Sequence, residues 1–217
     1  MIRLYVVCEG LTEVNFVTTI LKPHLEARTP DQIAISAPNL KGHCTYARLK
    51  KFVRNLLHSP AHAVIVTTMI DLFEIAGDFP GTSDPYDDKP GEHRVQYLEQ
   101  CCSEDIGDER FLPYLQLHEF EALVLTDLDA LAEQYPNQRN EIHELAKRLR
   151  DLPPEQVNRL SPPSRRIKQS VPEYSKTVGG LATVVRIGLS TLRARCPHFG
   201  PWIDCLENLA SESPDAI

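Results

Sequence analysis

The chain has 217 residues, a length that fits one α/β domain with a helical appendage and would crowd two full-sized domains. Apolar residues make up 42% of the sequence, yet no stretch approaches the ~20 apolar residues of a membrane span. The net charge of −7 argues against a protein coated in positive charge for nucleic acid. The amino terminus lacks a signal-peptide pattern and the six cysteines form no regular framework, so we expect reduced, mostly buried thiols in a cytoplasmic protein.

The first two thirds of the chain alternate strand and helix patterns. Residues Ile2–Val7 are apolar and end at Glu9-Gly10, as a buried parallel strand should, and the apolar spacing after Thr12 predicts a helix capped by that threonine. Such alternation predicts an α/β fold with a central, mostly parallel sheet flanked by helices. The further predicted elements are a strand at Ile33–Ala37, a helix at Tyr46–Leu57, a strand at Ala63–Ile70, a helix at residues 92–104, a strand at Phe111–Leu117 and a helix at Glu119–Gln134.

Two stretches interrupt this pattern. Residues 71–93 are rich in Gly, Pro and Asp, and loops of this length in compact domains tend to be functional or mobile. After residue 150 the sequence becomes Pro-rich and basic, and two helices are predicted within residues 179–196 and 199–210. We therefore expect an α/β domain at residues 1–150, with a connector and a C-terminal helical extension at residues 151–217 packed on the same domain.

Charge is distributed unevenly along the chain. Residues 69–135 contain 17 Asp and Glu against three Lys and Arg, whereas residues 147–176 contain eight Lys and Arg against three Asp and Glu. This polarity fits an acidic site beside a basic surface, although the solvated faces of two surface segments would give the same counts.

Acidic side chains follow three of the predicted strands. Glu9 follows the first strand, Asp71 follows the strand at 63–70, and Glu119 and Glu121 follow the strand at 111–117. The carboxyl ends of parallel strands meet at one edge, where open α/β sheets bind ligands. Clustered carboxylates repel each other unless a cation neutralises them, and oxygen ligands suit Mg²⁺ or Mn²⁺. The alternative is that each acid is a polar residue where a strand meets water.

Other kinds of site find less support in the sequence. No phosphate-binding loop, dinucleotide fingerprint or nucleophile elbow is present. Cys196 and His198 could supply two zinc ligands, but no second pair lies at zinc-finger spacing. His118 adjoins Glu119 as in a zinc-protease motif, yet the second histidine position holds Ala122, so a structural role for His118 is favoured.

A set of motifs spans nearly the whole chain: VCEGLTE from residue 7, IDLF (70–73), DFPG (78–81), LPYLQLHEFEALVL (112–125), SPPSRRI (161–167), YSKTVGG (174–180), IGLSTLRARCPHF (187–199) and the final W-x-x-x-L of Trp202 and Leu206. With these motifs the chain resembles the Toprim domain, the fold of topoisomerases, primases and the nucleases of the overcoming-lysogenization-defect type. More narrowly, it resembles a Toprim-like family of prokaryotic proteins often encoded beside ABC-type ATPases in defence loci. The resemblance implies a Toprim, Rossmann-like form of the α/β fold.

The resemblance assigns roles to particular acids. Glu9 matches the Toprim glutamate, a metal ligand in the nucleases and a candidate acid or base in the topoisomerases. Asp71 matches the first acid of the Toprim Asp-x-Asp, while Phe73 occupies the place of the second. Glu121 resembles the glutamate at the start of a helix in related nucleases, with Glu119 as a second choice. Whether Glu74 or Asp78 replaces the missing acid stays open.

This assignment implies phosphodiester hydrolysis of DNA or RNA by Mg²⁺ or Mn²⁺ held by Glu9, Asp71 and Glu121, with one or two ions. The implied partners are a nucleic acid substrate and an ABC- or SMC-type ATPase encoded nearby, in anti-phage defence. Tyr174 and Trp202 could stack on bases, but packing in the protein is favoured. The candidates for holding phosphates, or else charges on a solvated connector, are Arg165, Arg166, Lys168 and Lys176.

Two other functions compete with a nuclease. The first is a catalytically weak or inactive regulatory module that binds the ATPase, which the loss of an acid at Phe73 favours. The second is a metal-dependent nucleotidyl or phosphoryl transferase on the same scaffold, which the lack of a nucleotide-binding loop disfavours. The sequence does not distinguish DNA from RNA or an endonuclease from an exonuclease, and it gives neither the activating trigger nor the oligomeric state.

Overall fold

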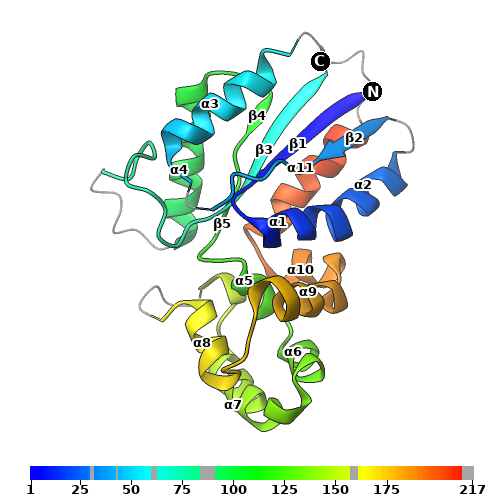
Figure 1. The fold of residues 1–217 in the computed structure, drawn as a ribbon, viewed down its shortest axis with the longest axis vertical. Helices are drawn as coiled ribbons and strands as arrows, with labels where there is room; N and C mark the ends of the chain where they lie inside the picture. Colours follow the sequence, from blue (N-terminus) through cyan, green and yellow to red (C-terminus); the bar gives the residue numbers. More distant parts are fainter. Residues whose placement is uncertain (30–31, 43, 60–62, 84–90, 157–160, 212–217) are drawn as a thin grey trace.

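The computed structural model describes residues 1–29, 32–42, 44–59, 63–83, 91–156 and 161–211 (Figure 1). Its centre is a five-stranded sheet in the order β2-β1-β3-β4, with β5 also paired to β3, and every pairing among these strands is parallel. The prediction of a mostly parallel sheet flanked by helices is therefore confirmed. The strands are β1 (Ile2–Cys8), β2 (Ile33–Ser36), β3 (Val64–Asp71), β4 (Phe111–Leu112) and β5 (Leu115–Gln116).

The register of the two central strands, β1 and β3, places their carboxyl ends at the same edge of the sheet. Cys8 at the end of β1 lies opposite Met69 of β3, and the backbone N–H of Glu9 donates to the carbonyl of Met69 at 3.1 Å. Asp71, the last residue of β3, lies opposite Gln116 of β5. The residues that follow β1, β3 and β5 are thus delivered to one edge of the sheet, as the sequence predicted.

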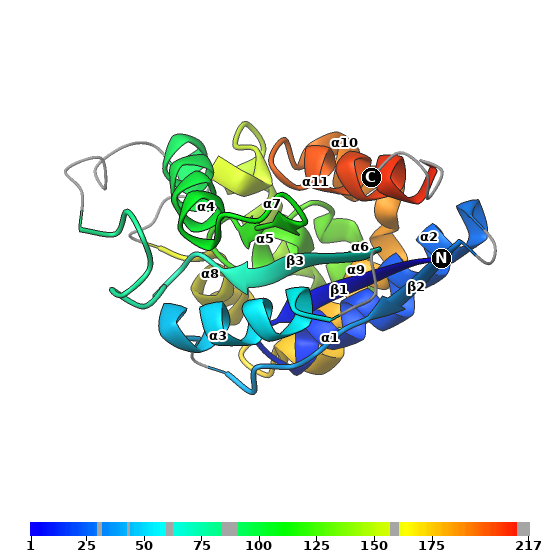
Figure 2. The same ribbon diagram turned by 90° about the horizontal axis from the view of Figure 1, so that it is seen from above.

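Helices cover both faces of the sheet (Figures 1 and 2). Apolar side chains of one face pack with helices α1 (Leu11–Phe16), η1 (Val17–Leu21), α2 (Lys22–Arg28) and α11 (Phe199–Ser211). Those of the other face pack with α3 (Tyr46–Leu57) and α4 (Gly91–Ile106). Burial of two apolar faces explains why β1 and β3 are apolar throughout and do not alternate with polar residues.

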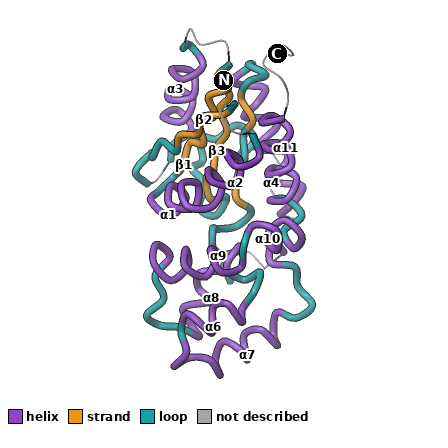
Figure 3. The backbone as a smooth tube through the Cα atoms, turned by 90° about the vertical axis from the view of Figure 1, so that its right-hand side faces the viewer, coloured by secondary structure: helices purple, strands orange, loops and turns teal. Residues whose placement is uncertain are grey.

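The remaining helices form a layer beyond the carboxyl ends of the strands (Figures 1 and 3). In this layer α6 contacts α7 and α9, and α7 contacts α8, so helices from both sides of residue 150 pack together. The division at that residue stays a prediction. The helices are α5 (Glu121–Val124), α6 (Leu128–Gln134), η3 (Pro136–Gln138), α7 (Arg139–Leu149), η4 (Pro154–Gln156), α8 (Pro163–Ser170), η5 (Lys176–Gly180), α9 (Leu181–Ile187) and α10 (Leu189–Arg195).

The first helix differs from its prediction at its start. Gly10, not Thr12, occupies the capping position, and the side chain of Glu13 accepts the N–H of Gly10 at 3.0 Å. Thr12 is instead the second helical residue, and its side chain is buried. The helix widens into the π-helix η1 just before Pro23, whose ring and missing N–H disfavour regular helix at that point.

Three other predicted segments also differ. The strand expected at 111–117 divides at Pro113, where the hydroxyl of Thr68 bridges the gap by bonding the N–H and the carbonyl of Tyr114 at 2.8 and 2.7 Å. The helix expected at 119–134 divides because the carboxylate of Asp127 caps a new helix, α6. Helix α8 forms inside the expected connector, since proline at its first position is compatible with a helix.

The last helix returns to the sheet through an aromatic stack. The Trp202 ring of α11 lies 4.2 Å from the Tyr114 ring at an interplanar angle of 9°, and its indole N–H donates to Thr67 Oγ1 at 2.9 Å. Trp202 and Tyr174 are both buried, which confirms that they pack within the protein. The six cysteines are free, and most are buried as predicted. Within the described ranges, no helix has the length and apolarity needed to cross a bilayer.

Candidate functional site

The site lies where the sheet meets the helical layer, and backbone hydrogen bonds tie its segments together. Glu9 follows β1, Asp71 ends β3, and Glu121 begins α5. Glu9 Oε2 accepts the backbone N–H of Asp71 at 3.1 Å, and Asp71 Oδ1 accepts the backbone N–H of Phe120 at 2.9 Å. These bonds hold the Glu9 turn, the end of β3 and the start of α5 in one arrangement.

Glu13 and Lys176 complete the cluster. The Lys176 ammonium lies 2.7 Å from Asp71 Oδ2 and 3.0 Å from Glu13 Oε1, and 5.7 Å from the centre of the Phe120 ring. The contact with Glu13 is an ion pair without hydrogen-bond alignment, since Glu13 Oε1 is buried and makes no hydrogen bond within the described part of the chain. We call Glu9, Glu13, Asp71, Glu121 and Lys176 the acidic cluster.

The carboxyl groups of Asp71, Glu13 and Glu121 therefore surround one ammonium in a largely buried place, while Glu9 is bonded to the Asp71 backbone. Burial raises the pKa of Asp71 despite the opposing effect of Lys176, and the charge of Glu13 raises it further. Burial likewise raises the pKa of Glu121 to about 7, again against Lys176. Burial alone would lower the pKa of Lys176, but Asp71, Glu13 and Glu121 raise it, so this lysine stays charged. Asp71 and Glu121 are therefore protonated more readily than exposed carboxyl groups.

The two glutamates of the 119–121 segment contact different groups. Glu121 is buried near Lys176, and Tyr174 lies beside it with a hydroxyl that makes no hydrogen bond of good geometry to any described residue. Glu119 instead accepts the backbone N–H and the hydroxyl of Ser164, each at 2.9 Å, at the positive amino end of α8. Of the pair, Glu121 is the one that the structure places in the cluster, while Glu119 links it to α8.

Where the resemblance expects a second acid the chain has Phe73, and the structure places neither Glu74 nor Asp78 in the acidic cluster. Phe73 extends the β3–β5 pairing through a 2.6 Å hydrogen bond from its N–H to the carbonyl of His118. Glu74 is exposed and has a left-handed backbone, with φ of 57°. Asp78 accepts the backbone N–H groups of Tyr46 and Ala47 at 2.9 and 3.1 Å, so it caps α3.

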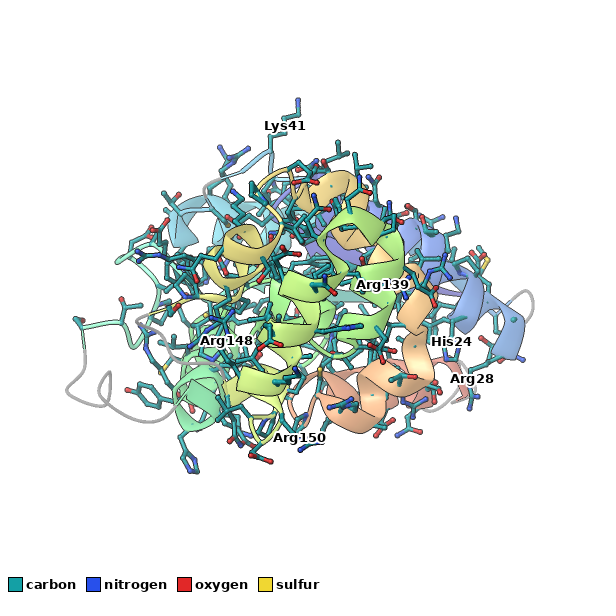
Figure 4. All side chains as sticks on the ribbon, turned by 90° about the horizontal axis from the view of Figure 1, so that it is seen from below. His24, Arg28, Lys41, Arg139, Arg148 and Arg150 are labelled. Carbon is teal, nitrogen blue, oxygen red and sulfur yellow. The ribbon has the colours of Figure 1, made fainter. Side chains whose placement is uncertain are left out.

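The predicted phosphate-binding residues occupy two kinds of place. Arg165 and Lys168 are exposed on α8, while Arg166 Nε donates to the carbonyl of Ser161 at 2.9 Å. Lys176 lies within the acidic cluster. Arg139, Arg148 and Arg150, at the two ends of α7, add basic groups on the lower side of the helical layer that the sequence analysis did not single out (Figure 4).

Sequence reasoning missed two members of the cluster. No functional role is assigned to Glu13 from the sequence, although its spacing of four from Glu9 places both acids beside the same turn. Lys176 was assigned to phosphate binding because it falls in a basic segment. Only the fold shows that the segment at 174–180 returns to Asp71, 105 residues earlier in the chain.

The residues fit a hard divalent cation in their chemistry. All their donor atoms are carboxylate oxygens, they outnumber the ammonium, and Glu13 Oε1 lacks a hydrogen bond. Within the part of the chain that the structure describes, no three His, Cys, Asp or Glu side chains form a ready metal-binding group. Lys176 lies between Asp71 and Glu13 in this arrangement.

The family model described as "Domain of unknown function (DUF4276)" matches residues 8–207. The chain belongs to the DUF4276 family. That match contains every member of the acidic cluster, from Glu9 to Lys176. No curated protein matches this DUF4276 chain.

Solved structures similar to this DUF4276 protein include two described as C-terminal regions of OLD proteins. The one from Burkholderia pseudomallei has 14% sequence identity and a TM-score of 0.51, and the alignment covers 96% of this chain and 98% of that one. The one from Xanthomonas campestris pv. campestris has 14% identity and a TM-score of 0.45, covering 95% and 96% of the two chains. At this identity the first likeness supports the α/β fold.

Proposed function

We propose that this DUF4276 protein is a Toprim-like, metal-dependent nuclease that hydrolyses phosphodiester bonds of DNA or RNA. The observation that carries the proposal is the acidic cluster itself. The carboxyl groups of Asp71, Glu13 and Glu121 lie beside one ammonium, with Glu9 bonded to the Asp71 backbone, at the carboxyl edge of a parallel sheet, where α/β folds bind ligands. A structural ion-pair network would balance its charges, whereas among the described residues three largely buried acids, Asp71, Glu13 and Glu121, lie beside Lys176.

The proposed cofactor is Mg²⁺ or Mn²⁺. Asp71, Glu9 and Glu121 would hold it, with Glu13 as a further ligand that the structure adds to the sequence prediction. When bound, such an ion activates water and neutralises charge on the scissile phosphate. Since neither Glu74 nor Asp78 lies in the place of the missing Toprim acid, we favour one strongly bound ion over two.

The chain's own residues would position the substrate. Arg165 and Lys168 on α8 are exposed and available for phosphate contacts, and Arg166 is held in place by Ser161. Glu119 couples this helix to the start of α5, through Ser164 at 2.9 Å. A backbone bound along α8 would therefore be positioned relative to Glu121 and Asp71. The predicted setting of this activity is anti-phage defence in the cytoplasm, with a separate ABC- or SMC-type ATPase as partner.

A second candidate function is a catalytically weak regulatory module that binds that ATPase. It is favoured by Phe73, whose backbone is used for strand pairing and whose side chain cannot bind a cation. In that case the acidic cluster would bind metal for structural reasons and leave phosphodiesters intact.

The test is a titration of Mg²⁺ and Mn²⁺ against labelled DNA and RNA, with the wild-type chain, Asp71→Asn and Glu121→Gln. We expect metal-dependent cleavage by the wild type, lost on adding a chelator and reduced by about 100-fold or more in each variant, since each removes a ligand. Lys147→Met, at an exposed salt bridge on α7, is the matched control and should cleave normally. Absence of cleavage with and without an ATPase partner, while metal still binds, would favour the regulatory module.

A further inference from the structure

Lys176 is presented to the acidic cluster by an unusual backbone. It is the first residue of the π-helix η5 (Lys176–Gly180), which continues directly into α9. The wide turn is closed by the N–H of Gly180, which donates to the carbonyl of Ser175 at 2.9 Å, five residues back. π-Helical turns are rare and occur frequently at functional sites.

Two tyrosines hold this turn against the protein. A Cβ atom on Gly179 would lie 1.8 Å from the Tyr135 hydroxyl, and one on Gly180 would lie 2.4 Å from the Tyr174 hydroxyl. The Tyr135 hydroxyl also accepts the N–H of Ser175 at 3.4 Å. A side chain at either position would force a tyrosine to move, so the two glycines allow the close packing of the backbone next to Lys176, whose side chain is 31% exposed.

The ammonium of Lys176 takes up acceptor oxygens that a metal ion would need. It lies 2.7 Å from Asp71 Oδ2 and 3.0 Å from Glu13 Oε1. An ammonium and a divalent cation cannot both lie in contact with the same two oxygens, because their charges repel at such distances.

We propose that Lys176 is an exchangeable internal counter-ion of the cluster. In the metal-free protein it neutralises Asp71 and Glu13, and a divalent cation binds only when the ammonium withdraws from them. Lys176 thereby lowers the affinity of the site for metal and sets the concentration at which the site fills. This inference rests on the proposed metal-dependent function and adds to it the residue that controls loading.

The first test measures Mn²⁺ binding by calorimetry at pH 8 for wild type, Lys176→Met and Lys176→Arg. Removing one positive charge a few ångströms from the ion should tighten Mn²⁺ binding by about 10- to 100-fold in Lys176→Met. Lys176→Arg keeps the charge and should show no such gain. Lys147→Met, at an exposed lysine on α7, is the matched control and should bind Mn²⁺ as the wild type does.

The second test uses wild-type protein alone and so does not depend on the folding of a variant. Reductive methylation of lysines, followed by mass spectrometry, should modify Lys176 faster with saturating Mn²⁺ than without it, while Lys168 is unchanged. Unchanged or slower modification of Lys176 would overturn the proposal, as would equal or weaker Mn²⁺ binding by Lys176→Met. If wild type and Lys176→Met both fail to bind Mn²⁺, the proposed metal-dependent function fails together with this inference. If the wild type binds Mn²⁺ and cleaves, but Lys176→Met binds Mn²⁺ no more tightly, only this inference fails.

Discussion

At the scale of single residues, Asp71 is the side chain and backbone position at which three segments of the site meet. Its backbone N–H is bound by Glu9, one carboxylate oxygen accepts the N–H of Phe120, and the other meets Lys176. The turn after β1, the start of α5 and the π-helix η5 therefore converge on one side chain. A neutral substitute such as Asn keeps the shape of the side chain, which is why Asp71→Asn separates loss of charge from loss of structure.

Asp78 is expected to matter for stability and not for metal binding. It caps α3 by accepting the N–H groups of Tyr46 and Ala47. Asp78→Ala should lower the free energy of unfolding by about 0.5–2 kcal/mol, the usual cost of a lost cap, as measured by urea denaturation. Mn²⁺ affinity, measured by calorimetry, should stay at the wild-type value. A large loss of Mn²⁺ affinity would show that Asp78 replaces the missing Toprim acid after all.

His198 gives the fold a pH dependence that is separate from the acidic cluster. Its Nε2 lies 3.0 Å from Glu99 Oε1 and 3.2 Å from the carbonyl of Leu115, and its ring stacks on Tyr114. Burial alone would lower the pKa of His198, but the hydrogen bond and negative charge of Glu99 outweigh it and raise that pKa. A base with a raised folded-state pKa stabilises the fold below its unfolded pKa, and this contribution is lost as pH rises through the folded pKa.

We therefore predict that wild-type stability falls as pH rises above about 6.5, and that His198→Gln removes this part of the fall. Urea denaturation at pH 6, 7, 8 and 9 measures it. His143→Gln is the matched control, because His143 is a surface histidine whose Asp129 partner lies 3.6 Å away. Equal pH slopes for wild type and His198→Gln would contradict the account of the Glu99 contact.

At the scale of elements, the π-helix η5 is the part of the site whose packing is tightest. Gly180→Ala should destabilise the protein by about 1–3 kcal/mol, because the new methyl group meets the Tyr174 hydroxyl. Tyr174→Phe removes that oxygen and leaves the nearest ring carbon at 3.2 Å, so the cost of Gly180→Ala should shrink in the double variant. Chemical denaturation of the wild type, the two single variants and the double variant gives the coupling free energy between the two positions. Strictly additive changes in the free energy of unfolding would contradict the contact between Tyr174 and the η5 turn.

Sequence reasoning succeeds for elements with a strong local pattern. The β-branched run of β3 and the apolar spacing of α3 predict those elements almost to the residue. It fails for η5 and α8 for physical reasons. KTVGG has two glycines and no apolar period, so its helix depends on Tyr135 and Tyr174 from elsewhere. In α8 the prolines mark a connector, although Pro163 at the first position favours a helix.

The members of the candidate site could be predicted only where a local sequence pattern places them. Glu9, Asp71 and Glu121 lie next to predicted elements, so alignment of strand ends was enough to bring them together. The position of Lys176 depends on packing between the helical layer and the sheet, for which no local pattern exists. Glu119 follows a strand as Glu121 does, but its side chain binds the backbone N–H of Ser164 at the amino end of α8 and not the cluster.

At the scale of the whole molecule, helix α11 joins the end of the chain to the central sheet. Trp202 stacks on Tyr114 between β4 and β5, and bonds Thr67 of β3. In the sequence, the helical layer thus lies between the strands β1–β5 and helix α11, which packs on those strands. Folding of the layer and of the sheet should be strongly coupled.

We predict one cooperative unfolding transition. The single tryptophan is buried at the junction of α11 and the sheet, so its fluorescence reports on that junction, while far-UV circular dichroism reports mainly on the helices. The two signals should give the same urea midpoint. Separate midpoints would instead support a division of the chain into independently folding parts near residue 150.

The most direct measurement of the central claim is the anomalous diffraction of a crystal grown or soaked with Mn²⁺. The proposed metal centre predicts anomalous density in bonding contact with the carboxylate of Asp71, with ligands also drawn from Glu9, Glu13 and Glu121. A crystal saturated with Mn²⁺ that shows no density at this edge of the sheet would contradict the account.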